Sequence, residues 1–198
     1  YLNTKTDTYC YQGGTKSEVA ECLKETIKKN KLVKLEGPLE TYNKSGFLTK
    51  VKSIEDFIKS NKLSDVNLIT ANGIIDFLES SNEEHQLYTL LLGEIITALS
   101  IQKDGGDFIL RIEDCFTNVT LKLLNILSNC YEKVDICKPL FSRPFTKEKY
   151  VVCKNLLLKG SARTNLIKKL KDLLNNMNNI LEKGKFVFDI ATDFTINP

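Results

Sequence analysis

The sequence predicts an α/β fold, a sheet flanked by helices, and three observations support this class. Short apolar runs bounded by turn residues are typical of strands, and they occur at 108–112, 133–137 and 149–153. The segment 119–130, between the first two runs, carries apolar residues at helical spacing. The resulting order of strand, helix, strand and strand is the order expected at the end of a sheet.

Composition indicates one compact globular chain. It has 198 residues, of which 42% are hydrophobic and 27% charged. Glu94 interrupts the longest apolar run, 87–101, so we expect no membrane span, and no secretory signal is visible at the start. A chain that begins at Tyr1 instead of Met is expected to be a fragment. The net charge of +3 is mild, so a nucleic-acid role would require clustered lysines.

The cysteines predict a reducing compartment. Six of them lack CxxC spacing, and a single histidine, His85, leaves little for a zinc site. We therefore expect buried reduced thiols in a cytoplasmic or nuclear protein, and no metal site. The cysteines are Cys10, Cys22, Cys115, Cys130, Cys137 and Cys153.

The first elements in chain order are a strand at 8–11, a turn at Gly13 and Gly14, and a helix with apolar residues at i, i+4 and i+8. A glycine turn between strand and helix is where a dinucleotide-like cofactor usually meets an α/β sheet. A second strand is expected at 32–39. Ser53, with Asp56 three residues later, resembles a capping box and predicts a helix at 53–62.

The middle of the chain predicts a ligand-handling edge. Residues 65–73 run into a strand with Asn72 at its carboxyl end, the end at which open α/β sheets bind ligands. Residues 83–103 predict a long helix, acidic at its start and basic at its end, that packs on the sheet. His85, in its first turn, is expected to be a solvent or capping residue.

The last part predicts a helix at 159–185 and then a strand. Lys168, Lys169 and Lys171 lie off the apolar face of this helix and are either a solvated surface or RNA phosphate contacts. Alternation of Phe186, Phe188 and Ile190 indicates a strand. The apolar face comprises Leu166, Leu170, Leu173, Leu174, Met177 and Leu181.

Three segments also resemble a known family. They are ITANG at 69–73, the stretch 98–116, and KPLFSRPFTKEKYVVCKNL at 138–156. Together they resemble the C-terminal half of the FtsJ-like S-adenosylmethionine-dependent ribose 2'-O-methyltransferases, most closely the branch that methylates the mRNA cap. The resemblance implies a Rossmann-like methyltransferase sheet whose last strand is antiparallel, formed by residues 1–158. Residues 159–198 would be a C-terminal helix and tail packed on or beyond this domain.

The resemblance implies S-adenosylmethionine as the cofactor, if one is bound. Tyr11 and Gln12 stand where the family carries Gly and Pro, and the missing glycine is the one that lets the backbone approach the cofactor closely. Tyr11 could fill the space meant for the methionine or ribose moiety. The positions that the resemblance assigns to the cofactor are Asp7, Gly13, Gly14, Glu36 and Asn72.

The resemblance also implies a catalytic Lys-Asp-Lys-Glu tetrad, which is altered here. The first Lys would precede Tyr1. Asn72 stands at the Asp position, Arg111 stands at the second Lys position, and Glu148 is retained. Arginine holds its proton far above any working pH, whereas a buried lysine can be tuned downward. These changes predict weak or absent activity, although Arg111 and Glu148 could instead form a structural ion pair with Asn72 hydrogen-bonded to either.

Three functions follow as hypotheses. The leading one is a degenerate, non-catalytic accessory module that binds RNA, such as capped mRNA, or a protein partner in a capping or transcription complex of a eukaryote or a large virus. The second is an active cap ribose 2'-O-methyltransferase with Arg111 as an electrostatic clamp and the upstream Lys as base. The third is a protein scaffold that uses the leucine-rich helix at 164–181.

Overall fold

Six strands and four helices are described in the computed structural model, which covers residues 8–11, 33–36, 48–61, 64–73, 83–140, 142 and 144–190. The strands are β1 Thr8–Tyr11, β2 Val33–Glu36, β3 Val66–Ala71, β4 Gln102–Ile112, β5 Tyr131–Cys137 and β6 Lys149–Leu156. The helices are α2 Val51–Asn61, α3 Glu83–Ile101, α4 Asn118–Cys130 and α5 Gly160–Glu182.

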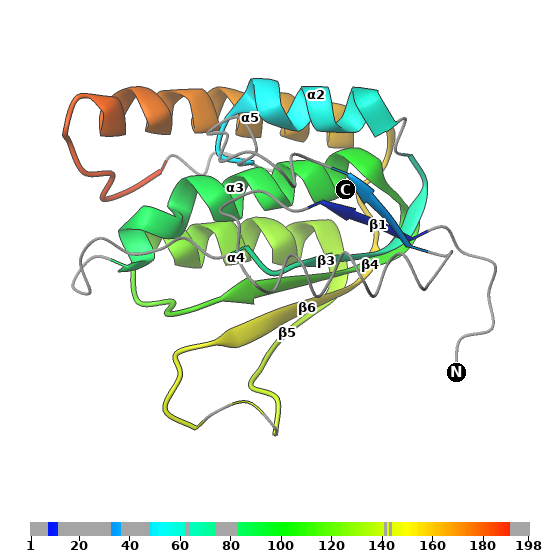
Figure 1. The fold of residues 1–198 in the computed structure, drawn as a ribbon, viewed down its shortest axis with the longest axis horizontal. Helices are drawn as coiled ribbons and strands as arrows, with labels where there is room; N and C mark the ends of the chain where they lie inside the picture. The colour runs from blue at the N-terminus through cyan, green and yellow to red at the C-terminus, as the bar shows by residue number, and fades with distance from the viewer. Residues whose placement is uncertain are drawn as a thin grey trace.

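The main sheet has four strands in mixed orientation and is covered by helices on one face (Figure 1). Its strand order is β3-β4-β6-β5. β3 and β4 are parallel, whereas β6 lies between β4 and β5 and is antiparallel to both. The predicted α/β class, with an antiparallel last strand, is confirmed.

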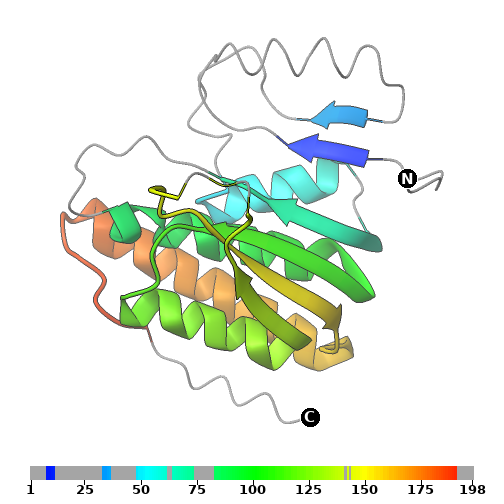
Figure 2. The ribbon, with the colours of Figure 1, turned by 90° about the horizontal axis from the view of Figure 1, so that it is seen from below.

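β1 and β2 form a separate parallel pair (Figure 2). Both occur where the sequence predicts strands, and β1 has the predicted bounds. Their register pairs Thr8 with Val33 and Tyr11 with Glu36, so the two carboxyl ends lie side by side. Asp7, Gly13 and Gly14 fall outside the described residues, as does the predicted helix after the glycine turn.

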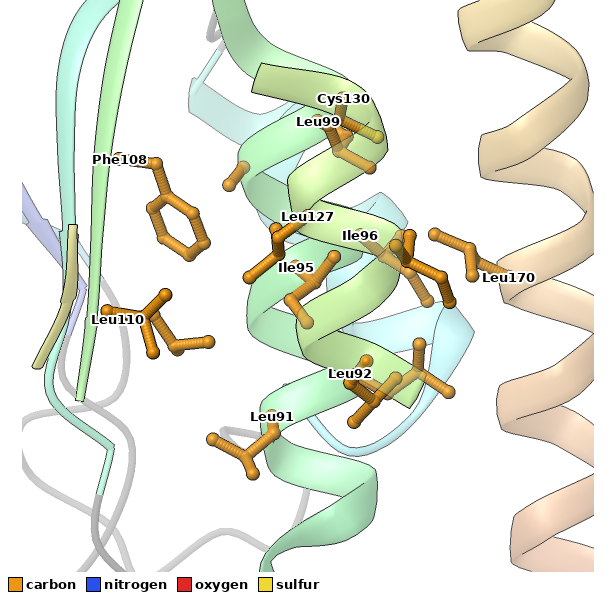
Figure 3. Packing of buried hydrophobic residues seen from close by; sticks show 14 of the residues in the cluster. Leu91, Leu92, Ile95, Ile96, Leu99, Phe108, Leu110, Leu127, Cys130 and Leu170 are labelled. Carbon is orange, nitrogen blue, oxygen red and sulfur yellow. The ribbon is translucent and has the colours of Figure 1, made fainter. Parts of the chain in front are cut away.

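α3 lies at the centre of the core, between the sheet and α5 (Figures 1 and 3). Phe108 and Leu110 of β4 point toward α3 from one side, and Leu170 of α5 approaches Ile96 from the other (Figure 3). A helix that is apolar around its circumference must be covered on all sides. Each fully buried side chain of this size contributes about 1.5–3 kcal/mol. This packing fixes α3 firmly relative to β4.

The leucine-rich face of α5 packs against other elements of the same chain. Leu166, Leu170, Leu174 and Met177 are buried in the core, and Leu173 and Leu181 pack partly buried against it. Most of this face is therefore buried within the chain, and the scaffold hypothesis stays a prediction with less support. Lys168 and Lys169 are exposed, whereas Lys171 lies 2.8 Å from the carboxylate of Glu55 on α2.

Several predicted helix ends differ from the observed ones, most informatively in α2 and α3. α2 begins at Val51, so Ser53 lies inside the helix and is not its N-cap. Its apolar face begins with Val51 and continues through Ile54 and Ile58, which pack into the core. α3 ends at Ile101, and the basic residue Lys103 belongs to β4 instead.

The predicted strand near the C-terminus is wrong for residues 185–190, which form no regular element. Phe186 and Phe188 are exposed, whereas Val187 and Ile190 are buried. Lys122 of α4 donates to the Ile190 carbonyl at 2.7 Å and pairs with Asp189, so the segment runs along α4. Because Phe186 and Phe188 are exposed, the alternation of Phe186, Phe188 and Ile190 does not mark a buried face, and residues 185–190 pair with no described strand.

The cysteine prediction holds in part. All four described cysteines are free thiols, and Cys130 and Cys153 are buried, which raises the pKa of each thiol to about 12. Cys115 is half-buried, and Cys137 is exposed, contrary to the prediction. Within the described ranges, no helix has the length and apolarity required to span a membrane.

Candidate functional site

Asn72 and Arg111 meet at the carboxyl end of two parallel strands. β3 and β4 pair Ala71 with Leu110, so the next residue on each strand lies beside its counterpart. The Arg111 Nη1 donates to the Asn72 Oδ1 at 3.3 Å. This contact lies at the carboxyl edge of the sheet, where open α/β folds bind ligands, and Asn72 is exposed there.

Glu113 holds the other side of the Arg111 guanidinium. The Arg111 Nη2 donates to the Glu113 Oε1 at 2.5 Å, and each side chain is only 16% exposed. The Arg111 Nε is buried and has no partner among the described residues. The guanidinium is therefore fixed between an amide oxygen and a carboxylate.

Glu148 reaches the same edge through Tyr150. The register of β4 with β6 places Tyr150 directly opposite Arg111, and the Tyr150 hydroxyl donates to the Glu148 carboxylate. That hydrogen bond, together with burial, raises the pKa of Tyr150, and the charge of Arg111 opposes the shift. In the described part of the chain Arg111 forms its ion pair with Glu113. The structural ion pair of Arg111 with Glu148, considered from the sequence, is not formed among these residues.

Glu94 of α3 is a site residue that the sequence interpretation missed. The Gly73 N–H donates to the Glu94 Oε1 at 2.9 Å. The Glu94 side chain is buried, and this burial raises the pKa of its carboxyl to about 7, against the opposing effects of the Gly73 hydrogen bond and the Arg111 charge. The informative feature was visible: Glu94 is the one charge in the apolar run 87–101.

Lysines at the start of β6 fix the surroundings of the site. Lys147 lies 2.9 Å from Glu83 of α3 and 3.4 Å from Asp114, the second residue after β4. Lys149 donates to the Glu113 carbonyl at 3.0 Å. Exposed pairs of this kind contribute little stability, about 0–1 kcal/mol each. Their effect here is geometric, because they join β6 to the segment that carries Glu113.

The remaining predicted residues contribute no described contact to this edge. His85 is half-buried, and its ring lies 5.2 Å from that of Tyr88 and 6.1 Å from that of Phe186; the solvent or capping role expected for it stays a prediction. Glu36 ends β2, and Asp7, Gly13 and Gly14 lie outside the described residues. The described residues contain no cluster of three side chains suited to a metal ion.

The side chain of Arg111 is suited to binding an anionic group at this edge and unsuited to proton abstraction. A guanidinium binds carboxylate or phosphate through paired hydrogen bonds and stays protonated at any working pH. Asn72 and Tyr150 add a neutral amide and a hydroxyl, groups that hydrogen-bond ribose or phosphate oxygens. Among the described side chains at this edge, the carboxyl of Glu94 has a pKa raised to about 7, but it is buried away from any ligand.

Comparison with known proteins gives consistent matches. A family model described as FtsJ-like methyltransferase matches residues 19–156. The chain is 28% identical over 159 residues to cap-specific mRNA (nucleoside-2'-O-)-methyltransferase 1 of Dictyostelium discoideum, covering 78% of this chain and 20% of that protein. The protein of the same name from Homo sapiens is 46% identical over 67 residues, 34% of this chain and 8% of that one.

The chain thus spans a fifth or less of the length of these relatives. A solved structure described as a ribosomal RNA methyltransferase from Plasmodium falciparum aligns with a TM-score of 0.44 and 17% identity. That alignment covers 73% of this chain and 100% of the other.

Proposed function

The chain belongs to the FtsJ-like methyltransferase family, and from this premise we propose that residues 1–158 form a cap-type RNA ribose 2'-O-methyltransferase domain that has lost its activity. It acts as an accessory module that binds RNA or a protein partner of a capping or transcription complex. The observation that carries the proposal is the Arg111 guanidinium, held between Asn72 and Glu113 at a position where the family resemblance implies a lysine.

The loss of activity follows from the chemistry of methyl transfer. A ribose hydroxyl is weakly acidic and needs help with deprotonation, which typically contributes about 10²–10⁴ in rate. That contribution corresponds to roughly 3–5 kcal/mol of barrier. Arg111 stays protonated, and Asn72 lacks the carboxylate that would balance and orient neighbouring cations. The two losses belong to one constellation, so their effects are not additive.

RNA recognition is supported by what remains at this edge. Arg111, Asn72 and Tyr150 present the donors and acceptors that ribose and phosphate groups require. The curated relatives are named for capped mRNA, and we propose the same class of ligand for this chain. The free thiols of Cys130 and Cys153 suit the reducing cytoplasm or nucleus, where such a ligand occurs.

We expect weak or absent binding of the cofactor S-adenosylmethionine. Among the positions that the resemblance assigns to S-adenosylmethionine, Asn72 is the one whose side chain is described, and its Oδ1 already accepts from Arg111. The described residues therefore do not make up a cofactor site, and the proposed function does not depend on one. Calorimetry with S-adenosylmethionine should show weak or absent binding. Submicromolar affinity would show that Tyr11 does not block the cofactor turn.

The deciding experiment is transfer of a tritiated methyl group from S-adenosylmethionine to capped RNA, with an active family member as positive control. We expect no incorporation above background, because Arg111 holds its proton. Clear turnover by the unmodified chain would overturn the proposal. Anisotropy with a labelled capped oligonucleotide then separates the two accessory roles, since a module that binds only a protein partner leaves the RNA free.

An active enzyme is the second candidate, favoured by the gathering of Asn72, Arg111 and Glu148 at one edge. The double variant Asn72→Asp with Arg111→Lys tests how the site is broken. If the tetrad alone is defective, the variant gains methyl transfer by orders of magnitude over the unmodified chain. No gain in the same assay would place the defect in cofactor binding or in the first Lys of the tetrad, which the resemblance places before Tyr1.

A further inference from the structure

The buried carboxyl of Glu94, on α3, contacts the end of the candidate site at Gly73. The Glu94 Oε1 accepts the Gly73 N–H at 2.9 Å, while the Glu94 Oε2 is buried without a described partner. The Nε of Arg111, the cation that acts on this carboxyl, is likewise buried without a described partner. Burying groups of this kind without full pairing is costly. A carboxyl kept at such a cost next to a ligand-handling edge is a candidate for a functional role.

The packing around Gly73 leaves this carboxyl little freedom. A Cβ built on Gly73 would lie 2.5 Å from the Glu94 Oε1 and 2.8 Å from the Leu90 Cδ2. Glycine is thus the residue that lets the end of β3 approach α3 so closely. Because the core fixes α3 relative to β4, Glu94 holds the turn after β3 against a rigid element.

The charges at the site complete the argument. The family resemblance implies a carboxylate at position 72, but Asn72 is neutral. Glu113 supplies one negative charge to Arg111 at 2.5 Å, and Glu94 lies close enough for its carboxyl to be affected by the Arg111 charge. The negative charges near Arg111 therefore come from Glu113, directly after β4, and from Glu94 of α3, whereas position 72 carries none.

We propose that Glu94 is a positioning residue of the candidate site. Its carboxyl holds the Asn72–Gly73 turn through the Gly73 amide, and it supplies from beneath the negative charge that Asn72 lacks, so that the Asn72 Oδ1 faces the Arg111 guanidinium. The inference rests on the proposed function in that it concerns the same site. It holds whether that site binds a ligand or also turns it over.

The groups that face Glu94 are few. From β4 the charged group acting on it is Arg111, and from the end of β3 the polar group is the Gly73 amide. The other helices packed against α3, which are α2, α4 and α5, add no described charged group that shifts its pKa. A change in the ionisation of Glu94 should therefore be felt first at Gly73 and Arg111.

The test uses proton–nitrogen correlation spectra of the full chain between pH 5 and 9, without RNA or cofactor. We expect the Gly73 amide and the Arg111 Nε–H resonances to titrate together, with a midpoint near pH 7. In Glu94→Gln, which keeps an acceptor and the side-chain volume, the shared titration should vanish and the Asn72 side-chain amide should shift. A titration of Gly73 and Arg111 that survives unchanged in Glu94→Gln would overturn the proposal, as would its absence from the unmodified chain.

The matched control is Glu113→Gln, which removes the other carboxylate on Arg111. It should move the Arg111 resonance but leave the Gly73 titration in place. Should Glu94→Gln fail to fold, Gly73→Ala gives a second measurement, because its Cβ would displace the carboxyl and should abolish the shared titration. Methyl transfer by the unmodified chain would overturn the loss of activity and leave these spectra untouched, so the two proposals fail separately.

Discussion

Single glycines decide how closely α3 approaches its neighbours. Gly73 lets the end of β3 reach Glu94, and Gly93 lets α3 pass against the backbone at Leu48. A Cβ on Gly93 would lie 1.6 Å from the Leu48 carbonyl oxygen, a clash with main chain that no rotamer change can relieve. The close approach of α3 to its neighbours therefore depends on the absence of a Cβ atom at Gly73 and at Gly93.

Gly93→Ala should therefore lower the free energy of unfolding, even though alanine favours helices. Overpacking of a well-packed core costs roughly 1–3 kcal/mol, which exceeds the gain of about 1 kcal/mol in helix propensity. The measurement is the urea midpoint at pH 7. Ser100→Ala on the same helix is the control, because its hydroxyl bonds only to the Ile96 carbonyl one turn back, and its effect should be small. Equal midpoints for Gly93→Ala and the unmodified chain would refute the clash.

The predictability of the site also varied from residue to residue. Asn72 and Arg111 were found from the sequence because strand ends are recognisable and the family pattern runs through them. Tyr150 was missed because its position opposite Arg111 depends on strand register, which sequence spacing does not define. Glu113 was missed although it lies only two residues after Arg111. Glu94 was visible as an isolated charge, but its partner Gly73 lies 21 positions away and meets it only through tertiary packing.

At the level of elements, the end of α3 is held by α5. The Arg163 Nε donates to the Leu99 carbonyl at 2.6 Å, and its Nη2 donates to the Gln102 carbonyl at 2.5 Å. The last carbonyls of a helix have no partner within the helix, and a cation there also favours the helix dipole. Arg163 therefore joins three structural units: the end of α3, the start of β4 and the first turns of α5.

Arg163→Gln should weaken this junction. Hydrogen bonds to a charged group contribute about 1.5–3 kcal/mol, and the shorter glutamine leaves buried carbonyls unpaired. We expect a loss of that order in the free energy of unfolding, together with faster amide exchange in the last turn of α3. Lys168→Gln removes an exposed charge from the same helix and should change stability by less than about 0.5 kcal/mol. A similar loss in both variants would mean that net charge, and not the junction, is responsible.

The elements themselves were well predicted where a pattern reflects packing on one partner. α4, α5 and the described strands occur where the periodicity places them, apart from shifts at their ends. Residues 185–190 were misassigned because alternating apolar residues need be neither buried nor part of a paired strand: Phe186 and Phe188 are exposed, and the backbone forms no regular element. Helix starts were harder, since the Ser53 capping pattern was outweighed by the apolar face that begins at Val51.

For the whole molecule, the half-buried Glu84 and the buried Glu94 give stability opposite dependences on pH. Burial raises the pKa of Glu84, but hydrogen bonds from Thr117 and Thr120 outweigh it, and the net pKa is lowered. A lowered pKa contributes stability above the unfolded value, and this stability is lost as pH falls through the folded value. Glu84→Gln should therefore destabilise the chain at pH 7 and have less effect in acid. Urea midpoints measured across this range would contradict the assignment if the difference grew in acid.

Glu94 acts in the opposite direction. Its pKa is raised from 4.5 to about 7 by burial, so the folded state binds its proton more tightly than the unfolded state does. Stability from this group is fully present below pH 4.5 and is lost as pH rises to about 7. At about 1.36 kcal/mol per pKa unit, the ionised carboxylate costs up to about 3 kcal/mol above neutral pH.

Glu94→Gln should thus stabilise the whole molecule at pH 8, by up to about 3 kcal/mol, because the buried amide carries no charge. The difference from the unmodified chain should shrink as pH falls and disappear near pH 4.5, where the glutamate is neutral in both states. Urea midpoints from pH 4.5 to 8 give the comparison. Glu113→Gln, which removes the carboxylate paired with Arg111, is the comparison variant. Equal stability of Glu94→Gln and the unmodified chain at pH 8 would mean that the Arg111 charge fully offsets the burial of Glu94, and that retaining this carboxylate costs the fold nothing.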